Sequence, residues 1–167
     1  MRYNKVLIIL AVILTLLGTF VFSIKGVPGT YACSGIGYIT NLPIIFEVAE
    51  SVAISKGWNV ILWYLLLIIF IIFLISGVFQ LIGLKYRILA LIFSLFPLIV
   101  GIMLIIIFFA PPYGDMAQTF LYYSYGEHFG NFFPFIVIIG EVGLGAYILV
   151  AGGVLGLISV FLPRDTT

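Results

Sequence analysis

Four long apolar runs, separated by polar, glycine-rich or proline-rich stretches, set the pattern of this chain. Each run is long enough for the roughly 20 residues that an α-helix needs to cross a bilayer. We therefore predict an all-α integral membrane protein, a four-transmembrane-helix bundle that forms a single domain over residues 1–167. The predicted spans cover residues 6–24, 59–83, 88–110 and 133–162, and the outer loops cover residues 25–58 and 111–132.

The second half of the first outer loop is predicted to form a short amphipathic helix. Asn41 suits the N-cap, Pro43 suits the first turn, and Gly57 suits the position just after the helix. Apolar residues recur there at helical spacing while the glutamates point elsewhere, as in a helix that lies in the membrane interface. Two interpretations stay open, because such a helix caps the bundle or binds a partner.

The second and third spans are joined by only Leu84–Arg87, so they must form an antiparallel hairpin. Pro97 lies inside the third span and predicts a kink, since proline lacks the N–H that a helix needs. Neighbouring helices or the Ser94 hydroxyl would then satisfy the backbone groups that the kink frees. The first span follows a short basic segment and also resembles a signal peptide. Its length favours a transmembrane helix that is not cleaved from the protein.

Basic residues near the ends of the spans predict the orientation. Five of them fall on the side of the two termini, and two fall on the other side: Arg2, Lys5, Lys85, Arg87 and Arg164 against Lys25 and Lys56. Because basic residues are enriched in cytoplasmic segments, we expect both termini in the cytoplasm and the protein in the cell membrane.

The fourth span carries a stripe of small residues on one side of the helix. At about 100° per residue, Gly145, Gly152, Gly156 and Ser159 fall close together, with Glu141 near the outer end of the stripe. Small residues let helix backbones approach closely, because lipid tails provide no hydrophobic force between helices. The stripe therefore predicts helix packing, either within the bundle or against another subunit.

Glu141 is the only ionisable residue that this pattern places well inside a span. Intramembrane carboxyls are functional hypotheses by default, as proton carriers or ligand anchors, and burial would favour their neutral form. The alternative is a structural glutamate that joins helices by hydrogen bonds, with Thr19 as a partner. The sequence leaves both roles open.

Composition agrees with a membrane environment and predicts little chemistry. The chain is 64% hydrophobic and 8% charged, which excludes most soluble proteins, and a net charge of +1 gives no electrostatic reason to bind nucleic acid. Cys33 is the only cysteine, so an internal disulfide is excluded. Glu127 and His128 are adjacent but lack the three or four ligands of a usual zinc site. We predict no catalytic residue, no metal site and no cofactor.

Aromatic residues gather in the second outer loop and at the entry to the second span. Rings with one apolar side and one polar edge suit the headgroup level of a membrane and the interfaces between proteins. The candidate interface consists of Trp58, Tyr122, Tyr123, Tyr125 and Phe129.

The layout resembles that of claudin and peripheral-myelin-type tetraspan proteins. The shared features are a cytoplasmic N-terminus, a longer first outer loop, a tight basic turn between spans two and three, and a glycine-rich fourth span. The resemblance concerns topology only, because the first-loop Gly-Leu-Trp and the cysteine pair of that family are absent. It implies a four-helix bundle and assigns no functional residue.

Two functions from different classes fit these patterns. The first is a non-enzymatic structural or accessory subunit that packs through the fourth span and the aromatic loops, against other membrane subunits or a second copy of itself. Its basis is the absence of a catalytic set and the shortness of the loops. The second is a small transporter, a channel-like protein or a quinone-handling redox subunit that uses Glu141 as its proton-active group.

Overall fold

The computed structural model describes residues 3–109, 114–127 and 133–162, and four of its helices are long and apolar enough to cross a membrane. The prediction of four such helices is confirmed, and the first three lie close to their predicted ranges. α1 (Tyr3–Leu16) continues as a π-helical segment, η1 (Leu17–Val21), and α3 (Val60–Phe79) continues as a 3-10 segment, η2 (Gln80–Leu84). α4 spans Arg87–Phe109, and α6 spans Leu144–Phe161.

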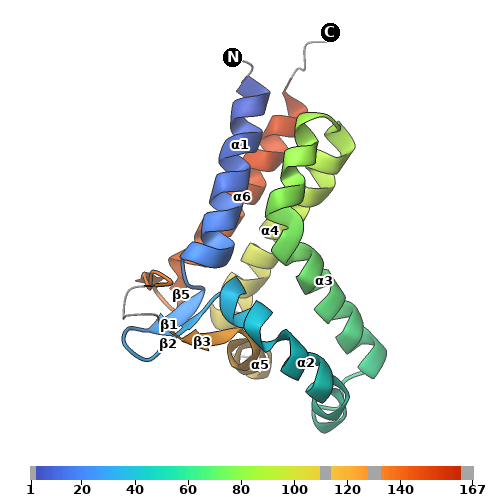
Figure 1. Cartoon of the computed structure of the whole chain (residues 1–167), viewed down its shortest axis with the longest axis vertical. Coiled ribbons are helices and arrows are strands. Elements are labelled where there is room, and N and C mark those ends of the chain that lie inside the picture. The colour runs from blue at the N-terminus through green and yellow to red at the C-terminus, as the bar shows by residue number, and fades with distance from the viewer. Residues whose placement is uncertain (1–2, 110–113, 128–132, 163–167) are drawn as a thin grey trace.

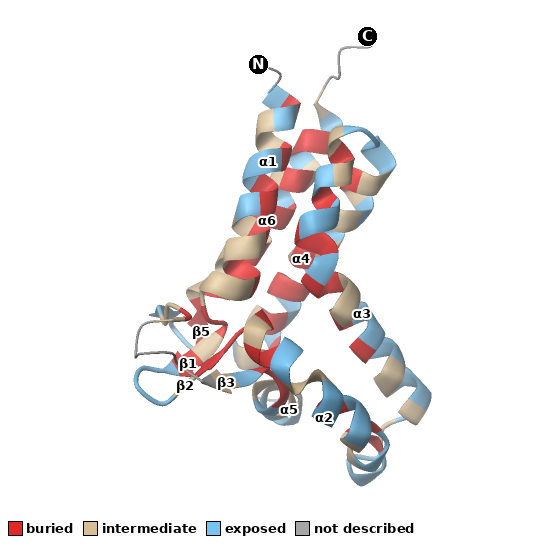
Figure 2. Ribbon diagram, viewed as in Figure 1, coloured by how far each residue is buried: buried red, intermediate tan, exposed pale blue. Residues whose placement is uncertain are grey.

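α6 lies at the centre of the bundle, between α1 and α4 (Figure 1). α3 packs against α4 and diverges from the other three helices toward its N-terminal end (Figure 1). Figure 2 shows the buried residues along the facing sides of these helices and exposed residues on their outer sides. Many of the exposed residues are large and apolar, for example Ile61, Leu62, Ile88 and Ile99. An apolar outer surface of this kind suits contact with lipid.

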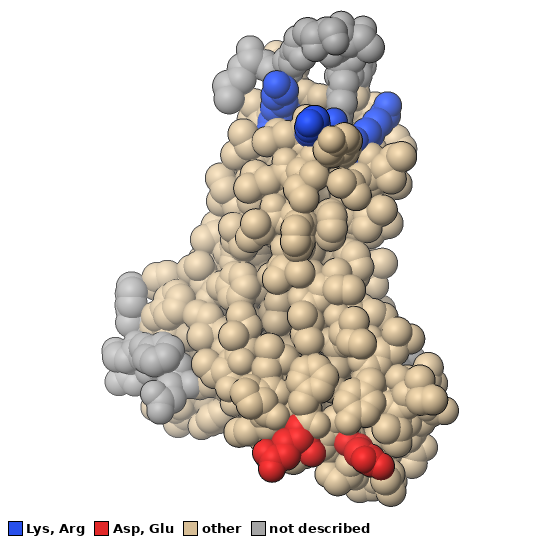
Figure 3. All heavy atoms as spheres, turned by 45° about the vertical axis from the view of Figure 1, so that its right-hand side comes forward, with Lys and Arg blue, Asp and Glu red and all other residues tan. Residues whose placement is uncertain are grey.

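The two ends of the bundle carry opposite charge. Figure 3 shows Lys and Arg side chains at one end, where α1 begins and α3 turns into α4, and Asp and Glu side chains at the other. The basic end includes Lys5, Lys85 and Arg87. α6 ends at this same end of the molecule (Figure 1), so the first and last helices of the bundle are antiparallel.

The helix of the first outer loop, α2 (Gly35–Ser55), is longer than predicted. Its N-cap is Ser34, whose hydroxyl accepts a hydrogen bond from the Ile36 N–H, so the prediction of Asn41 as N-cap is wrong. Asn41 instead lies inside the helix and donates to two carbonyls of the second outer loop. Gly57 follows the helix end with a φ of 66°, a conformation that glycine adopts without strain.

The two outer loops are joined by a small antiparallel sheet that the all-α prediction did not include. β1 (Lys25–Val27) and β2 (Tyr31–Cys33) form a hairpin in the first loop, and β3 (Tyr125–Glu127) from the second loop pairs with β2. The second loop also contains a helix, α5 (Gly114–Ser124), which packs against α2. The loops therefore form one outer module rather than two separate connections.

The predicted start of the fourth span, residue 133, is wrong. Helix α6 begins at Leu144, and the preceding residues form a hairpin of β4 (Ile138–Ile139) and β5 (Val142–Gly143). Gly140 turns this hairpin with a φ of 65°. Runs of valine and isoleucine suit strands as well as membrane helices, so apolar length alone did not reveal the boundary.

Candidate functional site

The small-residue stripe of α6 is buried inside the bundle. Gly145, Gly152, Gly156 and Ser159 are all buried. A methyl group added at Gly152 would lie 3.0 Å from the backbone nitrogen of Thr15 in α1. One added at Gly156 would collide with the Ser94 side chain in α4. The stripe therefore contacts helices of the same chain on both sides and is not left open for another subunit.

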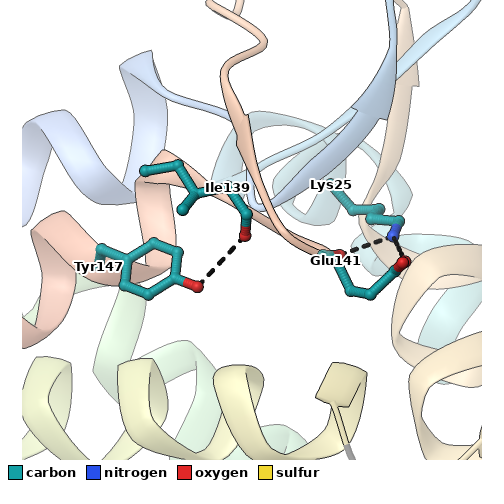
Figure 4. Close-up of polar contacts among 4 residues, drawn as sticks. All are labelled: Lys25, Ile139, Glu141 and Tyr147. Atoms are coloured by element: carbon teal, nitrogen blue, oxygen red, sulfur yellow. Dashed lines mark hydrogen bonds and ion pairs between the residues drawn. The ribbon is translucent and has the colours of Figure 1, made fainter.

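Glu141 lies outside the helix, in the turn of the β4–β5 hairpin, so its predicted place within the fourth span is wrong. Its side chain is 69% exposed. Lys25 Nζ lies 3.1 Å from Glu141 Oε2 and donates a second bond of 2.6 Å to the Glu141 backbone carbonyl (Figure 4). Thr19 is not its partner, because the Thr19 hydroxyl donates to the Thr15 carbonyl at 2.7 Å.

Side-chain contacts connect the β4–β5 hairpin to β1 and to α6, and Lys25 of β1 also contacts α4. Lys25 Nζ also lies 5.7 Å from the centre of the Phe108 ring in α4, within the range of a cation–π interaction. Tyr147, in the second turn of α6, donates its hydroxyl to the Ile139 carbonyl at 3.3 Å (Figure 4). Lys25 and Glu141 therefore form an exposed ion pair with a structural role.

We expect Glu141→Gln to lower the free energy of unfolding by less than about 1 kcal/mol, because exposed ion pairs contribute little and Lys25 keeps its bond to the backbone carbonyl. Lys25→Met removes both bonds and the cation over Phe108, so it should cost more, about 1 to 2 kcal/mol. Thermal unfolding of both variants in mild detergent measures the difference. Equal losses in the two variants would contradict this account of the hairpin.

A buried polar network that the sequence analysis missed joins three helices of the bundle. Pro97 has no N–H, so the Phe93 carbonyl one turn earlier in α4 loses its helical donor. Gln80 Nε2 donates to this carbonyl at 3.3 Å, and Gln80 Oε1 accepts from the Thr15 hydroxyl at 3.2 Å. Gln80 and Thr15 are each 1% exposed. The available signal was that Gln80 is the only glutamine within the predicted spans.

Most of the predicted interface residues meet in an aromatic cluster between α2, α3 and α5. The ring centres of Trp58 and Trp63 lie 5.0 Å apart, those of Trp63 and Tyr123 lie 6.0 Å apart, and those of Tyr122 and Tyr123 lie 5.4 Å apart. Tyr125 belongs to the neighbouring sheet, where its ring stacks on that of Tyr31 at 5.2 Å. The fifth predicted residue, Phe129, lies outside the described residues.

A groove of about 460 Å³ runs between α2 and the α5–β3 segment. Its walls are apolar or aromatic and carry no charged side chain: Tyr31, Asn41, Ile44, Ile45, Leu121, Tyr122, Tyr123 and Tyr125. The lining residue Asn41 donates to the carbonyls of Tyr123 and Tyr125, at 3.0 Å and 2.8 Å. The groove is thus built on a hydrogen-bonded contact between the two outer loops.

Four buried side-chain polar atoms have no hydrogen-bond partner among the described residues; one is the Ser23 hydroxyl, and three belong to aromatic residues in or against the hydrophobic core. The three aromatic groups are the hydroxyls of Tyr38 and Tyr123 and the indole nitrogen of Trp63. Burial raises the pKa of both phenols, and the Tyr123 phenol raises that of Tyr38 further, so both stay protonated at neutral pH. An unpaired buried polar group costs about 1 to 3 kcal/mol, so three together call for an explanation.

Cys33 is fully buried in β2. Burial raises the pKa of the Cys33 thiol to about 11, so Cys33 is protonated and a poor nucleophile at neutral pH. In the described part of the chain, no three His, Cys, Asp or Glu side chains come together as metal ligands. His128 lies outside the described residues.

Comparisons with protein-family models, with curated proteins and with solved structures found no match for this chain.

Proposed function

We propose that this protein is a non-enzymatic accessory subunit of an assembly in the cell membrane and that it contacts its partner through the outer module. The observation that carries the proposal is the exposure of aromatic residues outside the four candidate spans. Tyr122 in α5 is 67% exposed and Tyr125 in β3 is 50% exposed. Lipid contact explains exposed apolar residues on a spanning helix, whereas exposed tyrosines on a folded outer module are typical of protein interfaces.

The structure of the outer module supports this role. β2 and β3 pair residues of the two outer loops, and Asn41 adds two hydrogen bonds between them. A surface held in this way loses little conformational freedom when it binds, which favours association. Because the small-residue stripe of α6 is buried within the bundle, it is not part of the proposed partner contact. That contact is assigned to Tyr122 and Tyr125 alone.

The alternative of a transporter, a channel-like protein or a redox subunit with Glu141 as its proton-active group gains no support from the geometry. Glu141 is exposed and paired with Lys25 at the hairpin turn. A proton carrier within the membrane needs a carboxyl along the helix bundle, at a depth where water is scarce. The accessory role is therefore the better-supported proposal.

Native mass determination after extraction in mild detergent tests the proposal. We expect the wild-type chain in a complex heavier than the monomer, and the Tyr122→Ser/Tyr125→Ser variant to run as a folded monomer. The matched control is Tyr86→Ser, since Tyr86 is also 50% exposed but follows η2 at the basic end. A monomeric wild-type protein, or a complex that survives the double substitution, would overturn the proposal.

The orientation is part of the same proposal. The basic end of the bundle, with Lys5, Lys85 and Arg87, is assigned to the cytoplasm, and the outer module to the opposite side. With Cys33 replaced by alanine, a cysteine introduced by Ser55→Cys at the end of α2 should react with an impermeant thiol reagent in intact cells. A cysteine introduced by Tyr86→Cys should react only after the cells are opened, and labelling of the latter in sealed cells would reverse the orientation.

A further inference from the structure

Strand β4, in the hairpin before α6, exposes apolar side chains on both of its faces. Val137, Ile138 and Ile139 are 40% to 48% exposed. Successive side chains of a strand point to opposite sides, so a strand that packs on a protein core buries every second one. Apart from β5, β4 has no neighbouring strand among the described residues. In water, an apolar strand with an open edge invites aggregation, so these side chains call for apolar surroundings.

The hairpin lies at the level where the candidate spans end. At about 1.5 Å per residue, the 18 residues of α6 cover about 27 Å, slightly less than the roughly 30 Å of a hydrocarbon core. The turn of the hairpin lies beside the last residue of α4, because a methyl group added at Gly140 would lie 2.9 Å from the Phe109 ring. Figure 1 shows the hairpin nearer to the basic end of the bundle than the beginning of α3. The hairpin therefore lies within the thickness that the spanning helices occupy.

Side chains of the same chain bond to backbone carbonyls on both sides of the turn. The Tyr147 hydroxyl donates to the Ile139 carbonyl at 3.3 Å, and Lys25 Nζ donates to the Glu141 carbonyl at 2.6 Å (Figure 4). Backbone groups near lipid need such internal partners, because acyl chains form no hydrogen bonds. The open edge of β4 excludes the centre of the hydrocarbon core. It is compatible with the membrane interface, where water and headgroups reach the backbone.

The charges beside the turn limit the depth of the hairpin. Glu141 is exposed, and its Oε2 atom lies 3.1 Å from Lys25 Nζ. Charged side chains are tolerated at the headgroup level and are costly among acyl chains. With this ion pair among the headgroups, the apolar residues of β4 reach the adjoining ends of the acyl chains.

We propose that the β4–β5 hairpin is embedded in the membrane interface and that Val137, Ile138 and Ile139 contact lipid acyl chains in the leaflet beside the outer module. The Gly143 N–H donates to the Ile24 carbonyl at 2.6 Å, so the embedded hairpin also holds the outer sheet at the membrane surface. The inference rests on the four candidate spans crossing a bilayer. It does not rest on the accessory role, because the proposed partner surface lies on α5 and β3.

Spin-label accessibility tests the proposal on the full-length protein in phosphatidylcholine nanodiscs. In a Cys33→Ala background, a nitroxide is attached to the cysteine of Ile138→Cys or Ile139→Cys. Oxygen concentrates among acyl chains, whereas the polar complex of nickel with ethylenediaminediacetate stays in water. At both positions, the ratio of collisions with oxygen to collisions with the nickel complex should exceed that at Ile54→Cys about threefold or more.

Ile54→Cys is the matched control, because Ile54 is also an exposed isoleucine but lies one turn after Glu50 on α2. Ile99→Cys, at an exposed position in the middle of α4, provides the reference for contact with lipid. A ratio at residues 138 and 139 equal to that at residue 54 would place the hairpin in water. Low accessibility to both probes would place it under protein, and either result would overturn the proposal.

Discussion

Gly152→Leu is expected to lower the free energy of unfolding by about 1 to 3 kcal/mol, the usual cost of overpacking a well-packed core. At this position α6 and α1 approach within backbone contact. An added Cβ would lie 2.8 Å from the Thr15 hydroxyl oxygen and 3.1 Å from the Ala11 carbonyl oxygen. A leucine side chain must therefore push the two backbones apart, because backbone atoms do not move aside as a flexible side chain does.

The matched control for this variant is Ala151→Leu, which introduces the same side chain at the neighbouring residue of α6. Ala151 is exposed on the outer surface of the helix, so its substitution should change stability by no more than about 0.5 kcal/mol. Denaturation of the three proteins in mixed micelles, followed by circular dichroism, measures both effects. Similar stability of the two leucine variants would show that α1 and α6 do not pack as described.

Gln80→Leu is expected to cost about 1 to 3 kcal/mol, because it leaves the Phe93 carbonyl and the Thr15 hydroxyl without their partner in the bundle. The reason is specific to Pro97, which deprives that carbonyl of its helical N–H. Pro97→Ala restores the N–H. The cost of Gln80→Leu should therefore be smaller in the Pro97→Ala background than in the wild type, by about 1 kcal/mol.

A double-mutant cycle on the same denaturation assay measures this coupling. Thr15→Val provides the control, since it removes the bond to Gln80 Oε1 and leaves the bond to the Phe93 carbonyl in place. It should show no coupling to Pro97→Ala. Strict additivity between Gln80→Leu and Pro97→Ala would mean that the glutamine does not replace the missing helical bond.

The roles of individual polar residues were harder to predict than the helices that carry them. Pro97 was expected to free a backbone carbonyl, and the alternatives were neighbouring helices or Ser94. The donor is Gln80, the first residue of η2, thirteen residues away from Phe93 in the chain. Which side chain reaches that carbonyl depends on how α3 rotates against α4, and no local pattern contains this rotation.

The position of Glu141 also could not be predicted from the local sequence. Its place in an apolar stretch predicted an intramembrane carboxyl, yet the hairpin turn at Gly140 places it beside Lys25. That turn is stabilised by contacts far along the chain, because the Gly143 N–H donates to the Ile24 carbonyl at 2.6 Å and Lys25 bonds to Glu141 itself. Such contacts between distant residues outweigh the local preference for helix.

The sequence by itself determined the number of helices long and apolar enough to cross a membrane, most of their boundaries and the face of α6 that packs. These properties follow from the length and period of apolar and small residues, which are local and read directly from the chain. Only the tertiary structure decided that the glycine stripe packs within one chain, that the outer loops share a sheet, and that Trp63 and Tyr123 meet. Each of these depends on pairing residues far apart in sequence, as between Tyr31 and Glu127, and the free energy of such pairing comes from the assembled fold.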